Sequence, residues 1–110
     1  MNIKSKIWLE SNNGILLSEG RVQLLKKIDE TGSLSKASQA LNISYQKAWC
    51  LINETSKNAN QPILQTKIGG AKGGGTLLTP YGKSLITIFD TINKDCWDFL
   101  DEQLKKHALC

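Results

Sequence analysis

The sequence predicts an α+β fold in one small domain spanning residues 1–110, and three observations predict it. The chain has 110 residues, of which 40% are hydrophobic, and this is enough to bury one core without metals or disulfides. Several segments carry apolar residues at helical spacing, each preceded by a serine or threonine that can cap a helix. Other segments are rich in strand-forming residues beside glycine- or asparagine-rich turns, as in β-hairpins. The predicted order is β-β-α-α-α-β-β-α.

The N-terminal part predicts a β-hairpin followed by a helix. Bulky and β-branched residues are mixed with Lys4 and Lys6 at positions 3–9, and Asn12-Asn13-Gly14 supplies the turn before a second short strand at 15–17. Ser18 is a suitable N-cap, and Gly32 is a natural helix terminator. Between these two residues we expect a helix whose apolar face is made by Val22, Leu25 and Ile28.

Residues 33–58 predict two helices joined by a tight turn, the pattern of a helix-turn-helix. Ser35 can cap a short helix that runs to Leu41, and Ser44 can cap a longer one that runs to about Lys57. Asn42 tolerates the left-handed backbone of a sharp turn, and Ile43 can point back into the core. Small residues permit the two helices to approach closely, namely Ala37, Ser38 and Ala48.

Residues 63–78 predict a second hairpin, which would form a wing beside the helix-turn-helix. Apolar and polar residues alternate at 63–68, and they are followed by the glycine-rich stretch at 69–75 and by the apolar pair Leu77-Leu78. In such a wing, Lys72 and bare glycine backbone could approach a phosphate. Two alternatives stay open: a plain surface loop, and a nucleotide-binding loop, although GGAKGGGT lacks the Gly-Lys-Ser/Thr ending of such loops.

The last helix is predicted to span 80–106, because Thr79 can cap it and Pro80 fits its first position. Its apolar residues form two neighbouring stripes that occupy roughly half of its circumference. One small domain rarely covers so broad a face. We expect the three tryptophans to lie in the core or in a contact with a second copy rather than to stack on bases; they are Trp8, Trp49 and Trp97.

Positive charge is concentrated in the middle of the chain. The whole sequence has a formal net charge of +4, but residues 35–83 alone carry six lysines and one carboxylate, a net charge of +5. The lysines are a candidate footprint for phosphates, and Glu54 is the one opposing group. The acidic residues of the last helix are expected to form a solvated face directed away from an anionic partner; they are Asp95, Asp98, Asp101 and Glu102.

The helix that begins after Ser44 predicts an outward face suited to nucleic acid. Its polar side chains gather on one arc, opposite Ala48, Ile52 and Thr55. Its first turn carries a hydroxyl, a phenol, an amide and an ammonium, which can bind phosphates or base edges in a major groove. We therefore predict double-stranded DNA as a partner. The candidate contact residues are Ser33, Ser35, Lys36, Ser44, Tyr45, Gln46, Lys47, Lys67, Lys72, Gly73 and Gly74.

Other classes of protein are disfavoured by the composition. The three cysteines lack zinc-ligand spacing, which favours reduced thiols in a cytoplasmic protein. No apolar run is long enough to span a membrane, so we expect no membrane partner. No catalytic arrangement or metal site is recognisable, so we expect neither an enzyme nor a bound cofactor. The alternative function is a protein-interaction adaptor on the same scaffold, against which the charged middle segment argues.

Several motifs resemble the N-terminal domain of molybdate-responsive (ModE-type) transcriptional regulators, which is similar to the DNA-binding domain of LysR-type regulators. They are Gly32-Ser33-Leu34-Ser35, Ile43-Ser44-Tyr45 with Ala48-Trp49, Ile52-Asn53-Glu54, and Gly69-Gly70 through Gly73-Gly74-Gly75 to Leu78-Thr79 with Tyr81-Gly82. The resemblance covers nearly the whole chain. The family usually has a basic residue where Gln46 stands and an arginine where Thr66 stands.

The resemblance implies a winged-helix transcriptional regulator that binds operator DNA as a homodimer. It implies an interface formed by the first helix and the long last helix, for which the expected residues are Val22, Leu25, Leu85, Ile88, Phe89, Ile92, Trp97 and Leu100. Full regulators of this type add C-terminal oxyanion-binding domains, whereas this sequence stops at Cys110. We therefore expect it to act without an effector domain of its own and not to bind molybdate.

Overall fold

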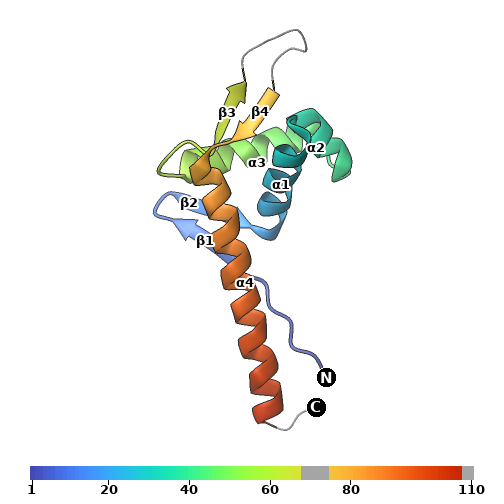
Figure 1. The fold of residues 1–110 in the computed structure, drawn as a ribbon, viewed down its shortest axis with the longest axis vertical. Helices are drawn as coiled ribbons and strands as arrows, with labels where there is room; N and C mark the ends of the chain where they lie inside the picture. The colour runs from blue at the N-terminus through green and yellow to red at the C-terminus, as the bar shows by residue number, and fades with distance from the viewer. Residues whose placement is uncertain (68–74, 108–110) are drawn as a thin grey trace.

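The computed structural model, which describes residues 1–67 and 75–107, confirms the predicted α+β order and the winged helix-turn-helix arrangement (Figure 1). A hairpin precedes three helices, and a second hairpin, the wing, leads into the long last helix. The elements are β1 (Trp8–Ser11), β2 (Gly14–Ser18), α1 (Glu19–Thr31), α2 (Leu34–Ala40), α3 (Tyr45–Asn58), β3 (Leu64–Lys67), β4 (Gly75–Leu78) and α4 (Pro80–Lys106).

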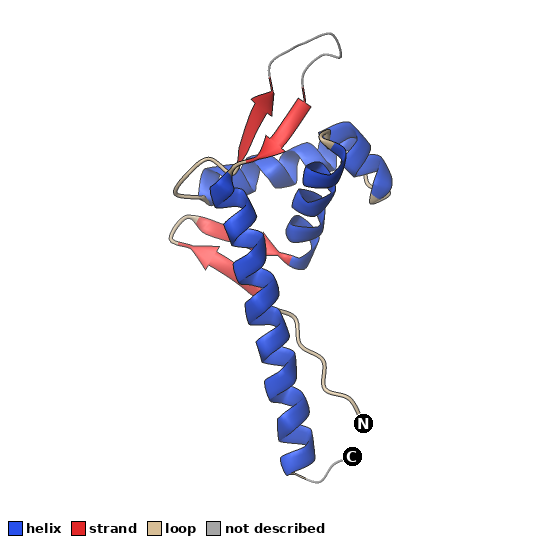
Figure 2. Cartoon of the chain, in the orientation of Figure 1, coloured by secondary structure: helices blue, strands red, loops and turns tan. Residues whose placement is uncertain are grey.

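The molecule consists of a packed head and a projecting helix (Figures 1 and 2). The head holds α1, α2, α3 and both hairpins around a core that includes Leu17, Leu24, Leu25, Ile28 and Ile63. The radius of gyration is 16.7 Å, whereas a compact domain of this length has about 13 Å. The difference arises because the C-terminal half of α4 extends beyond the head, where the N-terminal segment runs beside it.

The N-caps of the helices are those predicted, except for the N-cap of α2. The side chains of Ser18, Ser44 and Thr79 accept backbone N–H groups at the starts of α1, α3 and α4, as predicted. Helix α2 is capped by Ser33 rather than by the predicted Ser35, because the Ser33 hydroxyl accepts the Lys36 N–H at 3.1 Å and Ser35 already lies within the helix. The cap therefore sits next to the αL residue Gly32 (φ 71°), and α2 begins and ends slightly earlier than expected.

The first hairpin is shorter than the sequence predicted. Its first strand begins at Trp8, and residues 3–7 form no strand. The reason lies in the partner strand: Trp8 is opposite Ser18, and Ser18 is at the same time the N-cap of α1, so no further residue is available for pairing. Residues 3–7 instead lie along α4, where the hydroxyl of Ser5 is 3.5 Å from the thiol of Cys96.

The wing is an antiparallel pair in which Leu64 lies opposite Leu78 and Lys67 opposite Gly75. Ile63, predicted as the first residue of this hairpin, immediately precedes the strand, and its carbonyl accepts the Thr79 N–H at 3.0 Å. The same carbonyl fills the space that a side chain on Gly82 would need. This contact fixes the first turn of α4 to the base of the wing. Residues 68–74, which include all of the predicted glycine-rich tip except Gly75, lie outside the described residues.

The tryptophans are not core residues, which corrects part of the prediction. Trp8, Trp49 and Trp97 are 54%, 50% and 50% exposed. Trp8 lies on a two-stranded hairpin with no second sheet to cover it, and the other two lie on helix flanks beside the buried arcs. Within residues 1–67 and 75–107, no helix combines the length and the apolar character needed to cross a bilayer.

Candidate nucleic-acid interface

Helix α3 presents a polar face to solvent, as the helical wheel predicted. Its inner face packs into the core through Ala48, Ile52 and Thr55, which are all buried. Its outer face consists of exposed polar residues and one exposed thiol, and no other described part of the chain covers it; the exposed residues are Gln46, Lys47, Cys50, Glu54 and Lys57. The face is thus free to meet a partner.

A buried arginine that the sequence analysis missed fixes the orientation of α3. The Arg21 side chain is only 8% exposed, and its Nη2 lies 2.7 Å from the Glu54 carboxylate. Its Nη1 donates to the Thr55 hydroxyl (3.2 Å) and to the Ile15 carbonyl (2.7 Å), which also accepts from the Asn58 amide (2.7 Å). These bonds join α1, β2 and α3, and we call them the Arg21 clamp. They hold the C-terminal half of α3 against the head, whereas the first turn of α3 projects into solvent.

The clamp also has an electrostatic consequence. Glu54 is the only carboxylate among residues 35–83, and the Arg21 guanidinium neutralises it at hydrogen-bonding distance. The lysines nearby therefore face no unpaired negative charge within that segment. A signal for Arg21 existed in the sequence, since it shares the i, i+4, i+7 spacing of Leu25 and Ile28 on the apolar face of α1.

The base of the wing is tied to the turn between α1 and α2. The Gly32 carbonyl accepts the Thr76 N–H at 2.9 Å, and a Cβ on Gly75 would come within 2.9 Å of that same oxygen. This close approach requires glycine at 75. It places the start of α2, the start of α3 and the wing around one open hollow of about 370 Å³, lined by Gly32, Ser33, Leu34, Ser35, Tyr45, Thr66, Gly75 and Thr76.

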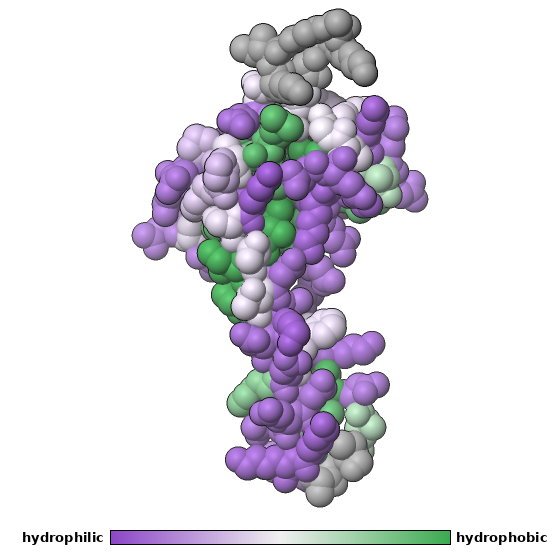
Figure 3. All heavy atoms as spheres, in the orientation of Figure 1, coloured by the Kyte–Doolittle hydropathy of each residue, from purple (hydrophilic) through white to green (hydrophobic). Residues whose placement is uncertain are grey.

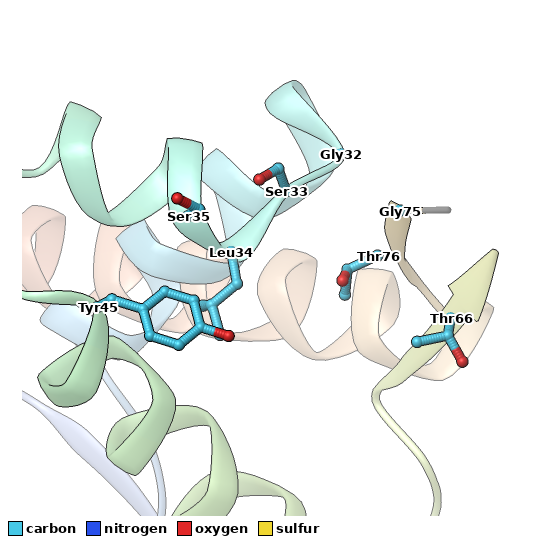
Figure 4. Close-up of a pocket in the computed structure, with 8 residues that line it drawn as sticks. All are labelled: Gly32, Ser33, Leu34, Ser35, Tyr45, Thr66, Gly75 and Thr76. Atoms are coloured by element: carbon cyan, nitrogen blue, oxygen red, sulfur yellow. The ribbon is translucent and has the colours of Figure 1, made fainter. Parts of the chain in front are cut away.

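Figure 4 shows the two sides of this hollow, with Leu34 and Tyr45 on one side and Thr66, Gly75 and Thr76 on the other. Of the predicted contact residues, the structure brings Ser33, Ser35 and Tyr45 together here. Lys36, Ser44, Gln46 and Lys47 are exposed in the adjoining first turns of α2 and α3 or at their caps. Lys67 is the last residue of β3, and Lys72, Gly73 and Gly74 lie outside the described residues.

The structure divides the expected dimer residues into two groups. The first group is at most 7% exposed and belongs to the core of the head, where it helps to hold α1 and α4 together; it consists of Val22, Leu25, Leu85 and Phe89. The others lie along α4, where apolar side chains are exposed among hydrophilic ones (Figure 3); Ile88, Ile92 and Trp97 are 47%, 44% and 50% exposed, and Leu100 is half-buried. Phe99, which was not among the expected residues, is 58% exposed.

Acidic residues accompany these apolar side chains on α4. Asp95, Asp98, Asp101 and Glu102 are all exposed, as predicted. The hydrogen bond between Lys94 and Asp98 (2.8 Å), together with the attraction between their charges, raises the pKa of the Lys94 ammonium. The two exposed helix faces therefore differ in chemistry: that of α3 is polar with lysines, and that of α4 is apolar with carboxylates.

Comparison with known proteins identifies several relatives of this chain, although no protein-family model matches it. A molybdenum transport protein ModE of Azotobacter vinelandii is 31% identical over 97 residues, which are 88% of this chain and 36% of that protein. The transcriptional regulator ModE of Haemophilus influenzae is 30% identical over 93 residues, 84% of this chain and 36% of its own length. The DNA-binding transcriptional dual regulator ModE of Escherichia coli is 39% identical over 72 residues, which are 66% of this chain and 28% of that protein. The chain thus spans about a third of the length of these relatives.

Proposed function

Since this chain is a relative of ModE transcriptional regulators over most of its length, we propose that it binds double-stranded DNA in the cytoplasm and regulates transcription. The observation that carries the proposal is the outer face of α3, which is polar, contains Lys47 and Lys57, and is left uncovered by the rest of the described chain. A helix of this kind fits the major groove of B-form DNA.

In the proposed complex the contacts divide by position along α3. Gln46 and Lys47, in the first turn, reach base edges, because an amide pairs with adenine and an ammonium with guanine. Residues at the starts of α2 and α3 and on the wing contact phosphates, which fix orientation without reading sequence. The Arg21 clamp supports this arrangement, since it holds α3 at one angle to the head.

We further propose that the chain acts as a homodimer through α4. The exposed apolar side chains at 88, 92, 97 and 99 would lose contact with water if a second copy packed against this helix. A two-fold dimer would present two α3 helices to successive major grooves, about 34 Å apart along the DNA. The operator is then expected to be roughly palindromic.

The proposal is tested by selecting bound fragments from a random duplex library. The wild-type chain should enrich a roughly palindromic sequence, and Gln46→Ala should relax the preference at one position in each half-site. Failure of the wild-type chain to bind any duplex at low salt would contradict the proposal and would favour an adaptor that binds protein. Enrichment of single, non-repeated half-sites would retain DNA binding but contradict the dimer.

A further inference from the structure

A second hollow adjoins the first and extends it along α3. It has a volume of about 560 Å³ and is lined by Leu34, Tyr45, Trp49, Ile52, Leu64, Gln65, Thr66 and Thr76. The two hollows share the residues at positions 34, 45, 66 and 76, so they form one trough between α3 and the wing. The trough is open to solvent along its length, unlike an enclosed site for a small molecule.

The two ends of this trough differ in chemistry. The end near the start of α2 is rich in hydroxyl groups from both walls. Among the described residues, the hydroxyls of Ser35, Tyr45, Thr66 and Thr76 make no hydrogen bond, so they remain able to donate to a ligand. The other end adds the half-exposed Trp49 together with Ile52, Leu64 and Gln65, so most of the side chains that it contributes are apolar.

Charge around the trough favours an anion. None of the residues that line either hollow is acidic. Lys36 and Lys47 are exposed in the first turns of α2 and α3, which border the trough. The nearest carboxylate along α3, that of Glu54, lies on the opposite flank of the helix, where it is bound to Arg21. An occupant of this trough must therefore combine negative charge with apolar surface.

We infer that the trough seats the sugar-phosphate backbone of one DNA strand, with phosphates at the hydroxyl end and a deoxyribose against the ring of Trp49. This inference rests on the proposed function and adds to it which part of the DNA the trough binds. A nucleic-acid strand carries anionic phosphates next to deoxyribose rings whose faces are largely C–H, which matches the hydroxyl-rich end of the trough and the more apolar end beside it. Hydroxyl side chains of serine, threonine and tyrosine are common phosphate ligands in protein–DNA complexes.

The assignment makes Trp49 and Thr76 backbone contacts rather than base-reading residues. Backbone contacts carry no sequence information, so their loss weakens binding uniformly. Trp49→Leu should therefore lower the affinity for a selected duplex and for a random duplex by the same factor, about tenfold. Thr76→Val, which removes one hydroxyl and keeps the β-branched shape, should lower both by about threefold. Gln46→Ala, in contrast, should lower only the affinity for the selected duplex.

Fluorescence of single-tryptophan variants tests the location directly. Trp8→Phe combined with Trp97→Phe leaves Trp49 as the only tryptophan, and its emission should change on saturation with duplex DNA. The matched control, Trp8→Phe with Trp49→Phe, leaves only Trp97 on α4; at protein concentrations at which the free chain is already dimeric, its emission should not respond to DNA. Binding is followed independently by the anisotropy of labelled DNA, and the thermal midpoint of each variant shows that the head remains folded.

The outcomes separate this inference from the proposed function. If labelled DNA binds while Trp49 emission stays constant, or if Trp49→Leu weakens only the selected duplex, the backbone assignment is overturned and DNA binding stands. If no duplex binds to the wild-type chain, the proposed function itself fails. A Trp49 response together with equal losses on both duplexes supports the inference.

Discussion

Helices α3 and α4 both leave a broad face exposed, but the two faces are chemically opposite. On α3 the exposed side chains are mainly polar, and its one carboxylate is bound by Arg21. On α4 exposed apolar residues alternate with exposed carboxylates, and half of the helix stands outside the head. An exposed polar face costs little in water, whereas a row of exposed apolar side chains indicates an absent partner. This contrast supports the two proposals that α3 meets an anion and that α4 meets a second copy of the chain.

The largest expected effect is on the α4 side of this comparison. Ile88→Glu combined with Ile92→Glu would place two charges per copy in the proposed interface, where they could not be solvated. We expect the dimer dissociation constant in sedimentation equilibrium to rise by at least about 100-fold, close to 3 kcal/mol. Ile15→Glu is the matched control, because Ile15 is 39% exposed but lies on β2. An unaltered dimer in the double variant would remove α4 from the interface.

The junction between α4 and the head is expected to give the next largest effect. Gly82→Ala would push a methyl group against the Ile63 carbonyl and should lower the free energy of unfolding by about 2 to 3 kcal/mol. Gly20→Ala in α1 provides the control, since the added methyl group would meet no atom within 4 Å beyond its own helical turn; there we expect a gain of about 0.5 to 1 kcal/mol. Equal urea midpoints for the two variants would show that α4 is not fixed at this contact.

The ion pairs Arg21–Glu54 and Lys94–Asp98 are expected to differ in their contribution to stability. Glu54→Gln would leave the Arg21 guanidinium, 8% exposed, without its counter-ion, and should lower the free energy of unfolding by about 1 to 2 kcal/mol. Asp98→Asn breaks an exposed pair on α4 and should leave the thermal midpoint unchanged. A reversed order of the two effects would mean that the Arg21 network does not hold α3.

A smaller effect is expected from a single contact on the polar face of α3. Lys47→Ala should weaken binding to a selected duplex by about 1 to 3 kcal/mol if its ammonium reads a base edge. Lys106→Ala, which removes the same charge at the far end of α4, should leave the affinity nearly unchanged in the same titration. Similar losses from both substitutions would indicate a diffuse electrostatic attraction rather than a contact made by α3.

Local signals explain why most of the fold could be predicted. The caps Ser18, Ser44 and Thr79, and the left-handed residues Gly32 and Asn42, act within a few residues of the chain. Ser33 and Ser35 both suit an N-cap by composition, and only the position of Gly32 relative to the turn decides between them. Local chemistry thus fixes the elements and leaves their exact ends to the tertiary structure.

The parts of the site that escaped prediction depend on contacts between distant residues. Arg21 and Glu54 are 33 positions apart, and Thr76 binds a carbonyl at position 32. The trough needs both contacts, because one orients α3 and the other sets the base of the wing. Val22, Leu25, Leu85 and Phe89 share the apolar pattern of an interface, but a pattern does not distinguish the inside of a head from its surface. Burial in the folded chain makes that distinction.

The salt dependence of duplex binding tests most directly whether α3 and the wing contact a polyanion. If about four cations of each copy contact phosphates, a dimer displaces counterions from about eight, and the logarithm of the binding constant should fall with the logarithm of salt concentration at a slope near −7. Lys36→Ala, which removes one such cation per copy, should reduce the slope to about −5. A slope close to zero for the wild-type chain would contradict the account, because α3 and the wing would then not meet a polyanion.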